Sequence, residues 1–179
     1  MIDTILFDLD GTLLKMDQDA FIANYFKMLG EAFSDLGMKR MINAVQQGTQ
    51  TMLSNNGEKT NEDVFWEKFK QHIDVNEALI KRFDCFYETK FQALKTLTTP
   101  QKKAKAMIEH LKSKNYTLVL ATNPLFPKIA THSRMKWANL QWDDFDLVTT
   151  FENSSYAKPN INYYKEILDK INKDPNQCL

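Results

Sequence analysis

The feature that most constrains the fold is a short apolar run near the N-terminus that ends in acidic and small residues. Residues 4–7 read Thr-Ile-Leu-Phe, and residues 8–12 follow with Asp-Leu-Asp-Gly-Thr. An apolar run of this length without alternation is typical of a strand buried on both faces, as in a parallel sheet. Gly11 permits the chain to turn sharply after the strand. We therefore predict a buried first strand whose carboxyl end carries Asp8 and Asp10.

The second half of the chain alternates between helical and strand patterns. Apolar spacing predicts helices at residues 102–114, 127–137 and 161–171. Apolar runs predict strands at residues 117–121 and 146–150, and the start of another at residues 177–179. This alternation indicates an α/β fold with right-handed crossovers and a parallel sheet. Ligands bind such sheets at the carboxyl ends of the strands.

Between these regions the pattern is helical and contains no convincing strand. Residues from about 16 to about 96, here called the insertion, show apolar side chains at helical spacing, which predicts about four helices. Thr60 is expected to cap one of them, because its hydroxyl can accept from an amide of the first turn. We interpret the aromatic residues of the insertion as packing rather than as stacking on a substrate; they include Phe65, Trp66, Phe86 and Tyr87.

Charge and composition narrow the classes of function. The 23 Lys and Arg residues balance the 23 Asp and Glu residues, so the formal net charge is +0. A balanced charge gives no support for nucleic-acid or membrane binding as the main activity. The two cysteines lack zinc-site spacing, and no signal peptide or apolar stretch of about 20 residues is present. We expect a soluble cytoplasmic protein, whose oligomeric state the sequence does not indicate.

Two acids beside a turn predict a cation site. Asp8 and Asp10 can converge only where the strand has ended, and their negative charges then repel unless a divalent cation neutralises them. Oxygen ligands of this kind suit Mg²⁺. The simpler alternative is a turn in which one Asp caps a helix. The apolar strand before Asp8 and the Gly-Thr pair after Asp10 favour the metal site.

The segment 8–12 resembles the first motif of the haloacid dehalogenase-like superfamily. The resemblance implies that Asp8 attacks phosphorus to give an aspartyl-phosphate, while Asp10 protonates the leaving oxygen and then activates water. Members that cleave carbon–halogen bonds typically lack the second acid, so Asp10 favours phosphoryl transfer. The family fold implied is a Rossmann-like three-layer core with an inserted helical cap. In this chain the core would comprise residues 1–15 and 97–179, and the cap residues 16–96.

Two further segments match the family in the expected order. Thr122-Asn123 follows the strand predicted at residues 117–121, where family members bind the phosphoryl oxygens. Lys158-Pro159 precedes the helix predicted at 161–171, where family members carry a catalytic Lys. The resemblance thus implies a catalytic role for Lys158 and substrate contacts for Thr122 and Asn123. The first motif adds Gly11 and Thr12 as substrate-binding residues.

The fourth family motif, which supplies further acids to the metal, is not found. It normally follows one more strand, and residues 177–179 at the end of the sequence look like the beginning of that strand. We expect the chain to be a shortened form of a longer enzyme; the alternative is a natural end and an impaired protein. Glu152 and Asp174 are conceivable replacements for the missing acid, although their spacing favours neither.

These inferences predict a Mg²⁺-dependent phosphatase that hydrolyses a small phosphomonoester through an aspartyl-phosphate. Its partner would be a small phosphorylated metabolite. Two alternatives remain open. A phosphomutase shares these residues and returns the phosphate to the substrate, whereas a non-catalytic member would only bind a phosphorylated ligand or a protein partner.

Overall fold

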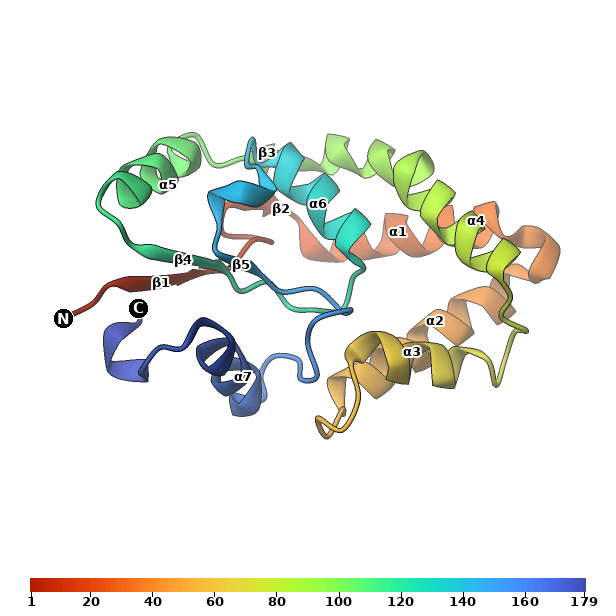
Figure 1. Ribbon diagram of the computed structural model, residues 1–179. Helices are drawn as coiled ribbons and strands as arrows, with labels where there is room; N and C mark the ends of the chain where they lie inside the picture. Colours follow the sequence, from red (N-terminus) through yellow and green to blue (C-terminus); the bar gives the residue numbers. More distant parts are fainter.

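A parallel sheet forms the centre of one half of the molecule (Figure 1). The computed structural model describes all residues from Met1 to Leu179. Its strands β1 (Thr4–Phe7), β4 (Thr117–Leu120) and β5 (Leu147–Val148) lie in the order β1-β4-β5, and both pairs are parallel. The predicted α/β fold with a parallel sheet is therefore confirmed, although β5 is shorter than the run at residues 146–150.

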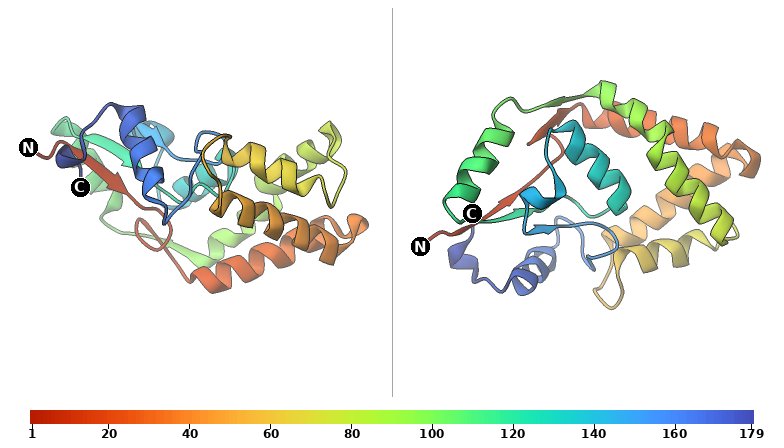
Figure 2. Two further views of the ribbon diagram at one scale, coloured as in Figure 1. Left: turned by 90° about the horizontal axis from the view of Figure 1, so that it is seen from below. Right: turned by 45° about the horizontal axis from the view of Figure 1, so that its top comes forward.

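Helices cover both faces of this sheet and complete three layers. They are α5 (Ala104–Ser113), α6 (Lys128–Trp137) and α7 (Ile161–Ile171). Side chains alternate across β4: Leu118 and Leu120 join the main apolar cluster, whereas Val119 and Ala121 pack against α7. The views in Figures 1 and 2 place α5 and α7 on opposite sides of the sheet. Burial on both faces explains why the strand sequences are continuously apolar.

The last residues of the chain add to the free edge of β1. Leu6 donates its amide N–H to the carbonyl of Leu179 at 2.8 Å, and the Leu179 amide donates to Thr4 at 3.0 Å. Thr4 and Cys178 form a parallel bridge. Gln177 still belongs to a short 3-10 helix, η4 (Pro175–Gln177), although its carbonyl accepts the Asp3 amide at 3.0 Å, and the bridged residue is Cys178. The expected start of another strand is thus confirmed one residue later.

The insertion contains four α-helices, as predicted. They are α1 (Gln18–Ala32), α2 (Met38–Leu53), α3 (Asn61–Phe69) and α4 (Glu77–Glu88), with 3-10 helices η1 (Ser34–Leu36) and η2 (Lys90–Leu97). The Thr60 hydroxyl accepts from the Asp63 amide, which confirms the predicted cap of α3. The helices lie beyond the carboxyl ends of β1 and β4 (Figures 1 and 2). No helix is long and apolar enough to cross a membrane.

The two chain segments that connect the insertion to the core half pair as strands, which the sequence did not predict. Strands β2 (Leu14–Met16) and β3 (Thr98–Pro100) form an antiparallel pair where the chain leaves and re-enters the core half. Met16 at the start of the insertion is therefore in a strand. Three-residue strands with polar members carry no clear periodicity, so only the proximity of the two connections reveals them.

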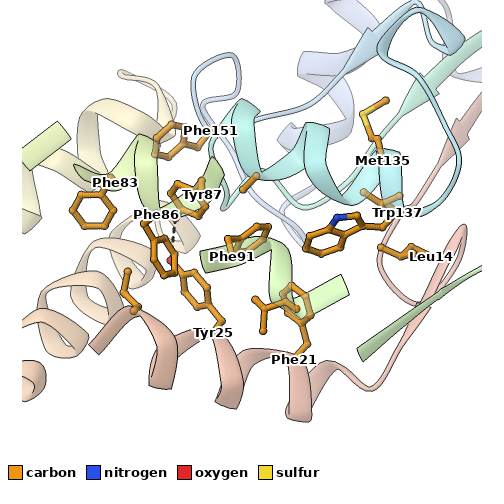
Figure 3. Close-up of a cluster of buried hydrophobic side chains, with 14 of the residues drawn as sticks. Leu14, Phe21, Tyr25, Phe83, Phe86, Tyr87, Phe91, Met135, Trp137 and Phe151 are labelled. Carbon is orange, nitrogen blue, oxygen red and sulfur yellow. Dashed lines mark hydrogen bonds between the residues drawn. The ribbon is translucent and has the colours of Figure 1, made fainter. Parts of the chain in front are cut away.

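An aromatic cluster packs the insertion against the core half (Figure 3). The hydroxyls of Tyr25 in α1 and Tyr87 in α4 lie 3.0 Å apart in a hydrogen bond. Phe91 of η2 stacks on Trp137 of α6 with ring centroids 5.3 Å apart. Phe86 is buried against Tyr25 and Phe91, as the packing interpretation expects, whereas the buried Tyr87 also lines a cavity. The cluster joins α1, α4 and η2 of the insertion to α6.

The N-terminal end of α3 docks on two loops of the core half. The backbone amide of Asn61 donates to the Ser154 carbonyl at 2.7 Å, and that of Glu62 donates to Phe151 at 2.9 Å. The fully buried Asn61 side chain donates to the carbonyls of Pro124 and Tyr156, both at 3.2 Å. One amide side chain thus binds the loops after β4 and β5 together.

Replacing Asn61 with Ala is expected to destabilise the protein by about 2–3 kcal/mol, because the Pro124 and Tyr156 carbonyls lose their donor and the Asn55 side-chain amide loses one acceptor. Urea unfolding would measure this loss. Asn56→Ala is the matched control, since the exposed Asn56 side chain makes only a local bond to the Glu58 amide. The control should change stability by less than about 0.5 kcal/mol. Equal stabilities of the two variants would contradict the docking role of Asn61.

Candidate active site

Asp8 and Lys158 meet at the carboxyl end of β1. Lys158 Nζ donates to Asp8 Oδ1 at 2.8 Å, although 150 residues separate the two along the chain. The Thr12 hydroxyl donates to Asp8 Oδ2 at 3.2 Å. The Asp8 side chain keeps 38% of its surface exposed, so solvent and ligands reach it. Oδ2 has the longer hydrogen bond and is the less firmly held of the two carboxylate oxygens.

In the turn after Asp8, two backbone amides donate hydrogen bonds to carbonyls of the same turn. Gly11 has a φ of 83°, a left-handed conformation that favours glycine, and its amide donates to Leu14 at 2.8 Å. The Thr12 amide donates to Leu9 at 3.2 Å. In this conformation neither amide is free for a phosphate oxygen. Of the two residues predicted to bind substrate here, only Thr12 presents a side chain to Asp8.

The carboxylate of Asp10 forms a buried ion pair with Arg134 of α6. Arg134 Nη1 binds Asp10 Oδ2, Nη2 donates to Thr131 Oγ1 at 3.2 Å, and only 1% of the Arg134 side chain is exposed. The guanidinium lies 4.6 Å from the ring centroid of Phe126. Burial raises the pKa of Asp10, and the charge of Arg134 offsets part of that increase.

The sequence analysis did not identify Arg134. The only local indication that Arg134 is buried is its spacing. It lies four residues after Ala130 and four before Ala138, both of which are buried on the same side of α6. An arginine among apolar residues at that spacing needs an acidic partner. The partner, Asp10, is 124 residues away in the sequence.

Two buried oxygen atoms near these residues have no hydrogen-bond partner. Asp10 Oδ1 and Thr122 Oγ1 are both enclosed and unpaired within the chain. The Thr122 carbonyl is fixed by hydrogen bonds from Thr149 Oγ1 at 2.7 Å and Tyr163 Oη at 2.9 Å. Buried polar atoms are rarely left without a partner, so an unpaired acid and hydroxyl indicate a ligand or water position.

Asn123 makes a contact that differs from the one expected. Its side-chain oxygen Oδ1 accepts the backbone amide of Lys158 at 3.1 Å. The predicted substrate residue therefore links the loop after β4 to the segment that carries Lys158. This contact positions Lys158 and explains why the two motifs lie side by side.

The acidic residues considered as replacements for the fourth motif do not assemble with Asp8 and Asp10. The structure contains no group of three or more His, Cys, Asp or Glu side chains arranged to hold a metal. Glu152 Oε1 accepts from the Lys128 amide at 2.7 Å, and Asp174 caps η4 by accepting from Asn176. The main-chain oxygen of Asp10 accepts from Gln18 Nε2 at 3.3 Å.

Comparison with known proteins finds a matching family and similar folds. The sequence profile of haloacid dehalogenase-like hydrolases matches residues 2–179. A HAD phosphatase from Thermococcus onnurineus superimposes with a TM-score of 0.57 and 17% identity, over 99% of this chain and 75% of that one. CbbY from Rhodobacter sphaeroides, solved with phosphate, superimposes with a TM-score of 0.57 and 18% identity, over 100% of this chain and 76% of that one.

The fold is shared across different reactions. L-2-haloacid dehalogenase from Xanthobacter autotrophicus superimposes with a TM-score of 0.51 and 15% identity, over 99% of this chain and 68% of that one. Among curated proteins, no sequence matches significantly. At these identities the likeness to solved structures establishes the fold, and the reaction must be argued from the site.

Proposed function

Because the chain belongs to the haloacid dehalogenase-like hydrolase family, we propose that it is a Mg²⁺-dependent phosphatase acting on a small phosphomonoester. Membership of this family supports a hydrolytic reaction. The proposal that the bond cleaved is a phosphate ester rather than a carbon–halogen bond rests on Asp10. The observation that carries the proposal is a second acid, two residues after Asp8, with one oxygen bound to Arg134 and the other unpaired. A dehalogenase has no need of such a proton donor.

The arrangement supports a two-step displacement. Asp8 Oδ2 would form a bond to phosphorus as the bond to the leaving oxygen breaks, and Asp10 would give that oxygen a proton. Asp10 would then take a proton from water as the water attacks the aspartyl-phosphate, releasing inorganic phosphate and free Asp8. Lys158, 2.8 Å from Asp8, would balance the negative charge of the nucleophile and the transferred group.

The raised pKa of Asp10 suits the first step. A buried carboxyl group keeps its proton to higher pH than an exposed one, which favours its use as an acid. The ion pair with Arg134 limits this increase, so the same group can also exist as the base that the second step needs.

Mg²⁺ would bind through the carboxylate of Asp8 and the main-chain oxygen of Asp10. Both are hard oxygen donors, and Mg²⁺ in proteins keeps several waters while using one or two protein ligands. The ion would supply positive charge to the transferring phosphoryl group. The Asp10 carboxylate is bound to Arg134, so the main-chain oxygen is the better candidate ligand.

The first test is hydrolysis of an aryl phosphate by the 179-residue chain with and without Mg²⁺. The proposal expects phosphate release that depends on the metal. Conversion of sugar phosphates without phosphate release would indicate a phosphomutase instead. Binding of inorganic phosphate without any turnover would indicate a non-catalytic member of the family.

Thr122→Val tests the phosphate contact separately. The Thr122 hydroxyl has no partner in the chain, so its removal should leave stability unchanged and lower kcat/KM by about 10- to 100-fold. Thr149→Val is the contrasting variant, because the Thr149 hydroxyl bonds to Thr122, Leu120 and Tyr163. That change should lower the melting temperature. Unchanged kinetics in Thr122→Val would exclude the phosphate contact.

A further inference from the structure

A cavity of about 690 Å³ lies between the insertion and the core half. All four helices of the insertion line it, together with residues 125–129 and 151–152 of the core half and His132. Figure 3 labels several lining residues, among them Tyr25, Phe83, Tyr87 and Phe151. Asp8, Asp10, Thr122 and Lys158 do not line it. The cavity is therefore distinct from the candidate active site, although Phe126 of its wall lies 4.6 Å from the guanidinium of Arg134.

Most of the cavity wall is apolar and aromatic, but two carboxylates interrupt it. The hydrogen bond from the Glu62 amide to the Phe151 carbonyl, 2.9 Å long, brings Glu62 beside Glu152. Both residues line the cavity. Glu152 Oε1 accepts from the Lys128 amide, whereas Oε2 is buried and has no hydrogen-bond partner. Burial and the nearby charge of Glu152 raise the pKa of Glu62.

No positive charge of the protein neutralises these two carboxylates. Neither Glu62 nor Glu152 forms an ion pair. The ammonium group of Lys128 lies 4.8 Å from the ring centroid of Trp142, and His132 packs edge-on against the same ring. Burial and the neighbouring Lys136 and Lys128 lower the pKa of His132, so this ring is neutral at neutral pH. Asp84 adds a third acid to the lining.

We propose that this cavity binds a small amphiphilic amine, with its apolar body among the aromatic side chains and its ammonium group between Glu62 and Glu152. A cation there would relieve the repulsion of the two partly buried carboxylates, Glu62 and Glu152, which both line the cavity. Aromatic faces such as Trp66 attract cations as well as apolar groups. The volume fits a drug-sized or smaller molecule.

This ligand site goes beyond the proposed phosphatase reaction and does not depend on it. A molecule in the cavity contacts both the insertion and the core half, so its binding energy would hold the two together. No step at Asp8 needs the amine. Binding can therefore be measured in Asp8→Asn as well as in the unaltered chain.

Phenethylamine is a suitable probe, with 2-phenylethanol and 3-phenylpropionate as neutral and anionic molecules of similar size. Titration calorimetry, supported by the fluorescence of Trp66 in the cavity wall, would give the three affinities. The amine is expected to bind at least about 10-fold more tightly than the alcohol, and the carboxylate least of all. Asp8→Asn should show the same order.

The double variant Glu62→Gln, Glu152→Gln tests the origin of the preference. It should lose the amine preference, with affinity for phenethylamine falling at least about 10-fold and affinity for 2-phenylethanol unchanged. Glu67→Gln is the matched control, because Glu67 lies in α3 but pairs with Lys59 on the surface. Thermal unfolding would verify that each variant is folded. Absence of amine binding, equal binding of amine and alcohol, or full affinity in the double variant would overturn the proposal.

Discussion

Replacing Asp8 with Asn is expected to lower phosphate release by at least about 1,000-fold while the chain stays folded. The variant keeps the size of the side chain and loses the charged oxygen that would attack phosphorus. In the variant the ammonium group of Lys158 has no carboxylate to pair with. We therefore expect it to remain available to a phosphate anion, so that phosphate binding is retained while turnover is lost. The rate with an aryl phosphate, measured alongside the far-ultraviolet circular dichroism, would separate loss of chemistry from loss of fold.

The chain offers a close control for this variant. Asp3 pairs with Lys173 at 2.9 Å, and the two side chains are 40% and 22% exposed. Asp8 and Lys158 pair at 2.8 Å and are 38% and 23% exposed. Asp3→Asn removes an equivalent carboxylate outside the site and should leave turnover unchanged. If Asp8→Asn kept more than about a tenth of the original activity, Asp8 could not be the nucleophile.

The second large effect is expected on stability. Arg134→Met should lower the free energy of unfolding by about 3 kcal/mol, because it leaves the Asp10 carboxylate without its counter-charge. We take the lower end of the usual range since 24% of the Asp10 side chain is still exposed. Methionine fills most of the space of the arginine stem, so the loss reflects charge more than volume. Urea unfolding at several pH values would measure it.

The dependence on pH identifies the cause of this loss. The charge of Arg134 lowers the pKa of Asp10, so Asp10 has a lower pKa in the unaltered protein than in Arg134→Met. Arg134 stabilises only the ionised carboxylate. Its contribution to stability is therefore present at high pH and is lost as the pH falls and Asp10 takes up a proton. The difference between the two proteins should therefore be larger in mildly alkaline than in mildly acidic buffer. Arg82→Met is the control, because Arg82 also pairs with an Asp and lies over a Phe ring but is exposed. It should have little effect at any pH, and a pH-independent loss in Arg134→Met would point to packing instead.

Local sequence patterns predicted the elements whose signals are local. The run at residues 4–7 and the periodicity at residues 161–171 correspond to β1 and α7 without adjustment. Thr60 was identified as a helix cap because capping involves only the next three residues. Motifs in the expected order also indicated Asp8 and Lys158, which the structure brings into contact, although their catalytic roles remain to be tested.

Residues whose importance depends on distant partners were missed. Arg134 reaches an acid 124 residues away, and Asn61 reaches a carbonyl 95 residues away. In the sequence, Asn61 was one polar residue of a helix start, and Arg134 one basic residue of an amphipathic helix. Pairing of β2 with β3 was hidden for the same reason, since each strand has only three residues and needs the other. The division into core and cap remains a prediction.

The docking of α3 has a mechanical consequence. Asn61 is bonded to Pro124 and Tyr156, which lie two residues from Thr122 and two residues from Lys158. One side chain of the insertion, Asn61, is thus bonded to both of the loops that carry Thr122 and Lys158. A force that separated α3 from the core half would therefore act on both loops at once, and would reach Thr122 and Lys158 through the backbone of each loop.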